Sequence, residues 1–323
     1  MVESLLQQLA QVVFVLAAAP LFPGVIDRAK HIIQSKRGPS IFQPYRDLWK
    51  LLRKGSVVPE ESTWLFRGAP YLVFVTPLAV AMLIPVLTAY PLPYAFMGDM
   101  LAGGFILALG SFFASTAALD PGSAFGGMGS SRARVVSLVA EPTIIMVLFG
   151  VTLLAQKTIP FDVTVTLAGP DLLLSAPHIL LGAALLMVIL AEAGRIPVDN
   201  PSTSFELSMI DHSRTLEYSG RLLALITWGG QMRLLVLLTI LLNVLTVPWG
   251  LVPAAAAGPI SLALAAVALS AKVLVVCAAI VVIESTAAKW RFFRIPEYLG
   301  ASFLLAALAT VTAYLTGVGR PGA

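Results

Sequence analysis

The chain has 323 residues, 58% of them hydrophobic and 12% charged, with a formal net charge of +4 and a mean hydropathy of +0.89. Soluble domains carry about a quarter charged residues, so this composition excludes an ordinary water-soluble fold. The single cysteine, Cys277, excludes a disulfide framework and an iron–sulfur cluster held by this chain alone.

Eight apolar segments are long enough to span a bilayer, which takes about 20 mostly apolar residues. They lie near residues 5–23, 69–89, 101–119, 135–155, 172–192, 229–248, 258–284 and 300–317. The first is not expected to be a cleaved signal peptide, because residues 1–11 contain Glu3 but no Lys or Arg. The sequence therefore predicts an all-α polytopic membrane protein, one integral membrane domain over residues 1–323 with about eight transmembrane helices.

The basic residues predict the orientation of these spans. Of the 21 Lys and Arg residues, seventeen fall in the loops after the first, third, fifth and seventh spans. The opposite loops hold only Lys157 and Arg320. Because basic residues collect on the cytoplasmic side, we expect both termini to lie outside. The small positive net charge is then a topology signal and does not indicate nucleic-acid binding.

The loop after the first span is expected to contain an amphipathic helix. Pro44 suits a first helical position. Apolar residues then follow at helical spacing, and basic residues lie on the other flank: Tyr45, Leu48, Trp49 and Leu52 on the first, and Arg46, Lys50, Arg53 and Lys54 on the second. This pattern is typical of a helix lying in the headgroup plane. The simplest interpretation is an interfacial anchor with no further role.

The loop between the fifth and sixth spans is unusually rich in charges of both signs. Such a mixture suits a docking surface, a proton route, or both. Its nine ionisable residues are Glu192, Arg195, Asp199, Glu206, Asp211, His212, Arg214, Glu217 and Arg221. Thr203 and Glu206 have the spacing of a capping box, which predicts a short helix inside the loop. The ion pairs expected on it are Asp211 with Arg214 and Glu217 with Arg221.

Ionisable residues within the spans are the strongest functional signal. Glu141 lies inside the fourth span, and Glu192 and Glu284 close the fifth and seventh. A carboxyl group at membrane depth is costly and usually serves a proton or ion path, although a structural hydrogen bond is the alternative. Lys272, inside the seventh span, is interpreted as a proton relay, as the partner of Glu141, or as a side chain that snorkels to the interface. Arg233 is expected to reach the inner interface.

Other patterns predict no catalytic or metal site. The three histidines, His31, His178 and His212, lack ligand spacing. The glycine-rich run 123–130 follows a span and not a strand, so we expect a flexible loop there and no phosphate cradle.

Two motifs give the chain a resemblance to a known family. The segment Ala191–Asp199 reads AEAGRIPVD, and Leu216–Gly220 reads LEYSG. In this order they resemble the signature of the respiratory complex I subunit 1 family, and Arg37-Gly-Pro39 is similar to that family's early loop. The resemblance covers nearly the whole chain.

Two branches of that family share the pattern. One is the quinone-reducing NADH dehydrogenase subunit, whose loop continues with several further acids. The other is the membrane subunit of energy-converting group 4 [NiFe] hydrogenases such as formate hydrogenlyase and hydrogenase-4. This chain keeps Asp199 and Glu206 but lacks the acids between them, and its Asn200-Pro201 step, its 43–47 run and its 294–297 run are more similar to the hydrogenase branch.

The resemblance implies a non-catalytic subunit in a prokaryotic inner (cytoplasmic) membrane. The expected partners are a [4Fe–4S] small subunit and a [NiFe] large subunit of a cytoplasmic arm, antiporter-like membrane subunits and the lipid bilayer, with no cofactor or metal on this chain. The residues expected to contact the redox arm are Arg37, Arg46, Arg195, Asp199, Arg214 and Arg221. The residues expected to form a proton path are Glu141, Glu192, Glu206, Asp211, Glu217, Lys272 and Glu284.

Two other functions remain open at this point. A quinone-site subunit of a complex I-like NADH or ferredoxin dehydrogenase is the alternative within the family. A stand-alone secondary ion transporter is less favoured, because such carriers are often built from inverted repeats and none is evident here.

Overall fold

A computed structural model describes residues 2–199, 210–254 and 258–317 of the chain. Across these ranges the regular structure is helical, apart from one isolated bridge between Thr88 and Val252. The elements are α1 (Val2–Ala18), α2 (Leu21–Ile33), α3 (Gln43–Arg53), α4 (Trp64–Leu83), η1 (Ala95–Met97), α5 (Met100–Leu119), α6 (Ala124–Ala155), α7 (Pro160–Leu167), α8 (Pro170–Leu173), α9 (Ala176–Glu192), η2 (His212–Thr215), α10 (Gly220–Thr239), η3 (Ile240–Thr246), α11 (Pro259–Thr286), η5 (Phe292–Arg294) and α12 (Ile295–Thr316).

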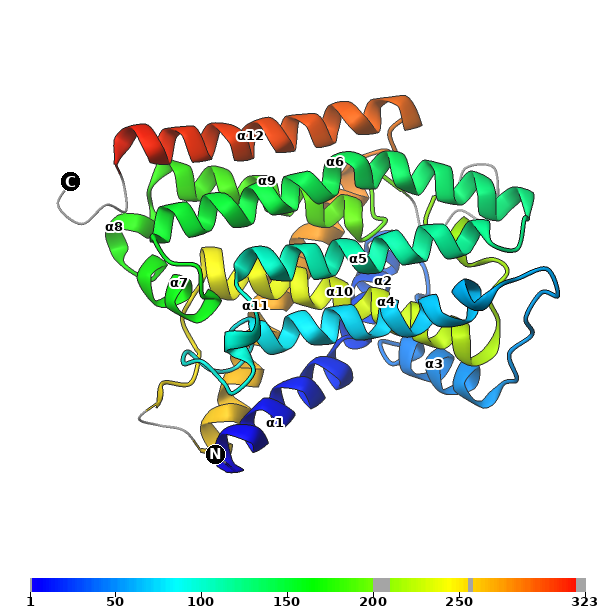
Figure 1. Cartoon of the computed structure of the whole chain (residues 1–323), viewed down its shortest axis with the longest axis horizontal. Helices are drawn as coiled ribbons and strands as arrows, with labels where there is room; N and C mark the ends of the chain where they lie inside the picture. The colour runs from blue at the N-terminus through cyan, green and yellow to red at the C-terminus, as the bar shows by residue number, and fades with distance from the viewer. Residues whose placement is uncertain (1, 200–209, 255–257, 318–323) are drawn as a thin grey trace.

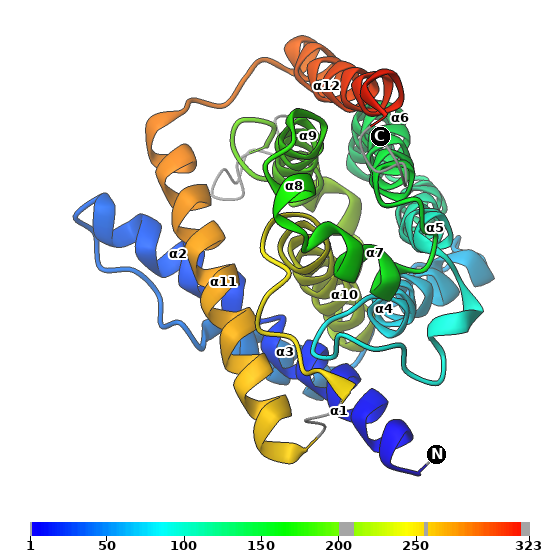
Figure 2. The ribbon, with the colours of Figure 1, turned by 90° about the vertical axis from the view of Figure 1, so that its left-hand side faces the viewer.

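The long helices form two layers with a crossing pair outside them. Helices α4, α5, α6 and α12 make a row, because each packs against the next (Figure 1). Helices α9 and α10 form the second layer, with α10 against α4 and α9 against α6 and α12. On the far side of this layer α11 packs on α2, well away from α12 (Figure 2). The first described part of the charged loop, residues 193–199, begins at the end of α9 and contacts the α2–α11 pair through Arg195.

Seven helical stretches in the described ranges are long and apolar enough to cross a membrane: Glu3–Ile33, Trp64–Leu83, Met100–Leu119, Ala124–Ala155, Gly220–Thr246, Pro259–Thr286 and Phe292–Thr316. The predicted fifth span corresponds to α9, which has 17 residues and is about 25 Å long, slightly shorter than a hydrocarbon core. The all-α, multi-pass membrane fold is confirmed, while the predicted total of eight spans stays a prediction.

Several expected boundaries were wrong. The first stretch is broken at Ala19–Pro20 into α1 and α2, so no single helix runs over 5–23. The sixth span begins at Gly220, nine residues before the expected start.

The short helix expected around Thr203 and Glu206 falls on residues outside the described ranges.

The glycine-rich run 123–130 is not a loop. Ser123 caps the start of α6 by accepting a hydrogen bond from the Gly126 amide at 3.2 Å, and the helix continues to Ala155, about 48 Å in all. A Cβ at Gly126 would lie 2.6 Å from the Ala118 carbonyl oxygen, and one at Gly129 would lie 2.6 Å from Ser213. These glycines permit close packing and do not make the segment flexible.

The predicted amphipathic helix is confirmed as α3. Pro44 lies in its first turn, as expected. Leu48 is buried against the protein, whereas Trp49 is 60% exposed and carries the Arg53 guanidinium 4.4 Å from its ring centre. One part of the apolar face of α3 therefore packs on the helix bundle, and the part that carries Trp49 is exposed.

The contact between α4 and α10 depends on one glycine, which gives a matched test. A Cβ at Gly229 would lie 2.6 Å from the Val73 carbonyl oxygen, whereas a Cβ at Gly230 has nothing within 4 Å. We expect Gly229→Ala to lower the stability of the purified protein by about 1–3 kcal/mol, because backbone cannot yield as a side chain can. Gly230→Ala is the control. Equal thermal midpoints for the two variants in detergent would contradict this packing.

Candidate functional site

The loop after α9 sends Arg195 into the protein, where it joins a cluster of four charges. Its guanidinium lies 3.2 Å from Asp27 on α2 and 3.3 Å from Glu284 on α11. The other oxygen of Glu284 lies 3.2 Å from the Lys30 ammonium. Arg195, Lys30 and Glu284 are all buried. Charges buried at this depth need partners, so these two carboxylates and two cations hold α2, α11 and the loop together.

Asp199 links the two described parts of the same loop. One of its carboxylate oxygens lies 2.7 Å from the Lys289 ammonium, and the other accepts hydrogen bonds from the Ile210 and Asp211 amides at 3.1 and 3.3 Å. The Trp290 amide donates to the Pro197 carbonyl at 2.9 Å. The segment after α11 is therefore attached to the loop after α9 at two points besides the Arg195–Glu284 pair.

A second ion pair lies between the two layers. The Glu192 carboxylate, at the end of α9, is 2.6 Å from the Arg233 guanidinium on α10. Arg233 also donates to the Ser111 hydroxyl on α5. The expectation that Arg233 reaches the inner interface stays a prediction; the structure shows that its partners are a buried carboxylate and a hydroxyl of neighbouring helices.

Asp211 and Arg214 form the ion pair predicted for the loop, on η2. Loss of water around the carboxyl acts to raise the pKa of Asp211, but the adjacent Arg214 guanidinium and its hydrogen bond outweigh that effect. The pKa of Asp211 lies below its ordinary value as a result, so the group is ionised near neutral pH.

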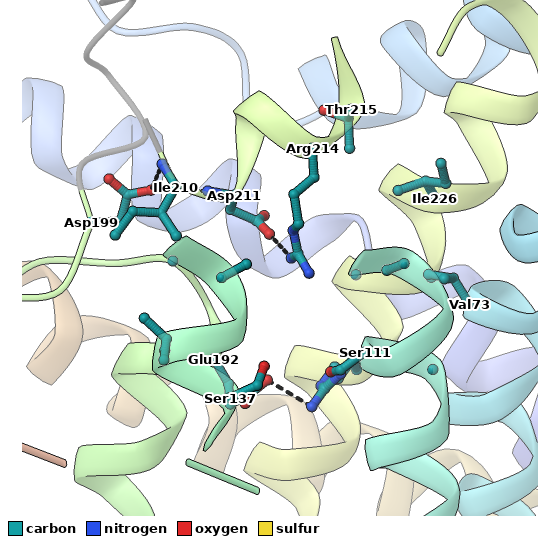
Figure 3. Close-up of a pocket in the computed structure, with 18 of the residues that line it drawn as sticks. Val73, Ser111, Ser137, Glu192, Asp199, Ile210, Asp211, Arg214, Thr215 and Ile226 are labelled. Atoms are coloured by element: carbon teal, nitrogen blue, oxygen red, sulfur yellow. Dashed lines mark hydrogen bonds and ion pairs between the residues drawn. The ribbon is translucent and has the colours of Figure 1, made fainter. Parts of the chain in front are cut away.

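A cavity connects these two ion pairs. It is lined by residues of α4, α5, α6, α9, α10 and the loop, including Glu192, Asp199, Asp211, Arg214 and Arg233. Figure 3 shows Asp211 and Arg214 pointing toward one another on the loop side, with the Glu192 ion pair deeper among the helices. The cavity offers about 130 Å³ to the centres of water-sized molecules. A polar cavity needs at least about 10–15 Å³ of such space to hold one water, and this cavity exceeds that threshold several-fold.

Polar atoms around the cavity still need hydrogen-bond partners. The Nε atoms of Arg214 and Arg233 are buried without one. Glu141 lies one turn along α6 from Ser137, which lines the cavity and hydrogen-bonds the Glu141 carboxyl. The Oε1 atom of Glu141 is buried and has no hydrogen-bond partner. Waters in the cavity would satisfy these atoms and link the two ion pairs into one hydrogen-bonded route.

The YSG part of the second motif has a packing role. Tyr218 stacks on Phe66 with 4.0 Å between ring centres, and its hydroxyl donates to the Phe66 carbonyl at 3.1 Å. Burial, and then the Asp120 carboxylate, raise the pKa of Tyr218. Gly220 has a φ of +52°, and a Cβ there would lie 2.3 Å from the Gly55 carbonyl oxygen. The motif docks the segment after α3 onto the start of α10.

The structure brings together only some of the residues expected in a proton path. Glu192 and Asp211 line one cavity, with Glu141 beside it. Glu284 belongs to the Arg195 cluster, and Glu217 is exposed and forms no ion pair with Arg221 in the described structure. Glu206 lies outside the described residues.

Lys272 is not the partner of Glu141. Its ammonium group contacts the Asn243 side chain and the Val247 carbonyl, at the end of α10 opposite the charged loop.

The residues expected to contact a redox arm are only partly exposed at the surface. Arg37, Arg46 and Arg221 are exposed, whereas Arg195 and Asp199 are buried and Arg214 lines the cavity. Sequence reasoning missed Asp27, Lys30 and Lys289 as internal partners. The one signal was that Asp27 and Lys30 lie a single helical turn apart in an apolar stretch.

The arrangement suits proton transfer along the cavity. Over the residues described, no three His, Cys, Asp or Glu side chains gather as a metal site would require. The carboxyl groups at the cavity can gain and lose protons, and the guanidinium groups can orient water.

Comparisons with known proteins agree on one family. The model of the NADH dehydrogenase family matches residues 7–315. Formate hydrogenlyase subunit 4 of Escherichia coli (strain K12) is 32% identical over 310 residues, which cover 96% of this chain and 98% of that protein. Hydrogenase-4 component C of the same organism is 34% identical over 314 residues, 96% of each chain.

A solved structure shares the fold. A chain in the membrane-bound sulfane sulfur reductase, described as an archaeal respiratory membrane complex, superposes with a TM-score of 0.78 and 18% identity. The match covers 96% of this chain and 99% of that one. At this identity the likeness concerns the fold alone.

The four-charge cluster gives a stability test. We expect Glu284→Gln to destabilise the protein by about 3–5 kcal/mol, because it leaves Lys30 and Arg195 buried without their shared carboxylate. Glu61→Gln removes a carboxylate from an exposed loop residue and is the control. The thermal midpoint in detergent is the measurement. A midpoint for Glu284→Gln equal to that of the control would show that the cluster does not hold the fold.

Proposed function

This chain belongs to the family of NADH dehydrogenase subunit 1, and we propose that it joins the cytoplasmic redox arm of a membrane-bound [NiFe] hydrogenase complex to an ion-translocating membrane arm. Its relatives are membrane subunits of hydrogenase and complex I-like respiratory complexes. The identities of 32% and 34% over nearly the whole chain to two hydrogenase components support this branch. The partners are a [4Fe–4S] small subunit, a [NiFe] large subunit and antiporter-like membrane subunits.

The orientation follows from the charges. With the loop after α9 facing the cytoplasm of a prokaryotic cell, both termini lie outside the inner membrane. Arg37, Arg46 and Arg221, which are exposed, then face the redox arm. Arg195, Asp199 and Arg214 support that surface from within, through Glu284, Lys289 and Asp211.

One observation carries the proton-coupling role: the cavity that connects the loop with the middle of the bundle. Protons enter at Asp211 and pass along water in the cavity, beside the Glu192–Arg233 ion pair, to Glu141, while Arg214 orients the water. Arg233 holds Glu192 by an ion pair, whereas Glu141 has an oxygen without a hydrogen-bond partner. Glu141 is therefore the group that takes up and releases the proton, and Glu192 and Arg233 set the charge beside it.

The hydrogenase branch is tested by the subunits that remain bound to this chain. We expect the complex purified gently from its native membrane to contain stoichiometric nickel and to reduce dyes with hydrogen. Nickel content and hydrogen-dependent dye reduction are the measurements. Iron–sulfur proteins without nickel, together with inhibitor-sensitive quinone reduction, would instead place the chain in the respiratory dehydrogenase branch.

Proton coupling is tested separately in the complex reconstituted into vesicles. We expect Glu141→Gln to keep redox turnover, while the number of protons moved per turnover falls by about tenfold or more. The reason is that a side-chain amide does not take up or release a proton near neutral pH. Glu61→Gln is the matched control, because that glutamate is exposed in a loop. Unchanged translocation per turnover in Glu141→Gln would remove Glu141 from the path.

A further inference from the structure

The last two turns of α3 carry exposed side chains that are either basic or aromatic. They are Trp49, Lys50, Arg53 and Lys54. Residues 48–59 contain no acidic side chain, and Asp47, just before them, accepts a hydrogen bond from the Gln43 side chain at 2.8 Å. Within the described ranges none of the three cations forms an ion pair. This surface therefore carries positive charge for which the described part of the chain supplies no counter-charge.

Trp49 and Arg53 form one unit on this surface. The Arg53 guanidinium lies 4.4 Å from the centre of the Trp49 ring, one helical turn away. The electron-rich ring face holds the cation in place, while the N–H groups at the edge of the guanidinium remain open to other partners. In the described structure they donate to no acceptor. A fixed guanidinium with open N–H groups matches the paired oxygens of a phosphate.

The end of α3 is fixed at a boundary of the apolar spans. The Ser56 hydroxyl accepts hydrogen bonds from the Arg221 and Leu222 amides at 3.0 and 3.4 Å, in the first turn of α10. The Val57 amide donates to the Ser219 hydroxyl at 2.8 Å. Helix α10 opens the apolar stretch Gly220–Thr246, so α3 ends where that stretch begins. Figure 1 shows α3 below α4, at the edge of the bundle.

Large apolar side chains are exposed at the same boundary. Trp49 is 60% exposed, Val57 is 74% exposed, and Trp64, the first residue of α4 and of the next apolar stretch, is 76% exposed. Tryptophan gathers at the level of the lipid headgroups, where its ring meets apolar chains and its N–H meets water. Protein interfaces are instead depleted of lysine, which this surface has at positions 50 and 54. The composition favours lipid over a protein partner.

From these observations we infer that the last two turns of α3 form a binding site for an acidic phospholipid, whose phosphate lies against the Arg53 guanidinium. Lys50 and Lys54 add positive charge around the phosphate, and Trp49 lies among the headgroups and the upper acyl chains. The helix thus selects the charge of its lipid neighbours, which a passive interfacial anchor would not do. The inference needs only a chain that spans a membrane, so it does not rest on the hydrogenase branch.

Photocrosslinking from position 49 identifies what covers this surface. Trp49→benzoylphenylalanine keeps an aromatic side chain at an exposed position and makes it photoreactive. The complex is placed in vesicles of equal parts phosphatidylglycerol and phosphatidylcholine, and mass spectrometry counts the lipid adducts on the peptide that carries residue 49. We expect phosphatidylglycerol adducts to outnumber phosphatidylcholine adducts by about fivefold or more, because a single basic residue near an anionic surface contributes about that factor.

Two further variants separate a local site from the general charge of the loop. Added to the photoreactive chain, Arg53→Gln should lower the adduct ratio by about fivefold, because the phosphate loses its guanidinium. Lys36→Gln removes one positive charge from an exposed residue between α2 and α3 and is the matched control. In that variant the ratio should stay unchanged.

Each other result overturns the inference. Equal numbers of the two adducts in the photoreactive chain mean that α3 is an anchor without lipid preference. Adducts to another polypeptide mean that a protein covers the surface. A ratio that Arg53→Gln leaves unchanged, or that Lys36→Gln lowers equally, assigns the preference to the loop as a whole. None of these results affects the Glu141 route, which lies around a separate cavity.

Discussion

Charges buried near the charged loop are held by opposite charges, and the fold around the loop follows from this pairing. Glu284 alone would be costly to bury; with Lys30 and Arg195 it becomes the point at which α2, α11 and the loop meet. Glu192 and Arg233 do the same for α9 and α10. In an apolar surrounding these pairs have few alternatives, which gives each helix one position relative to the loop.

The pairing also divides the polar residues into two kinds. Most of the charged residues under the loop form ion pairs that hold the helices together. A shift of the loop would therefore be transmitted to α11 through Glu284, Lys289 and Trp290. Glu141 differs, because it has Ser137 as a partner and an oxygen left over beside a cavity with room for water. A group that is not committed to an ion pair can change protonation without disturbing the packing of the helices.

Apolar length and basic-residue placement were enough to predict the fold class, most of the spans and the helix at α3. The sequence also pointed to Glu141 and Glu192 as polar residues inside the membrane. Their partners were not predictable, because Glu192 and Arg233 meet only through the packing of α9 on α10. The glycines of 123–130 suggest flexibility by local propensity, yet close contact with Ala118 and Ser213 determines their helical structure.

We propose that Glu141, beside the Glu192–Arg233 ion pair, changes protonation during turnover. Infrared difference spectra of the complex, recorded between its oxidised and reduced states, test this directly. We expect a protonated-carboxyl band that shifts in heavy water, disappears in Glu141→Gln and remains in Glu61→Gln. A silent carboxyl region, or a band that survives in Glu141→Gln, would contradict it.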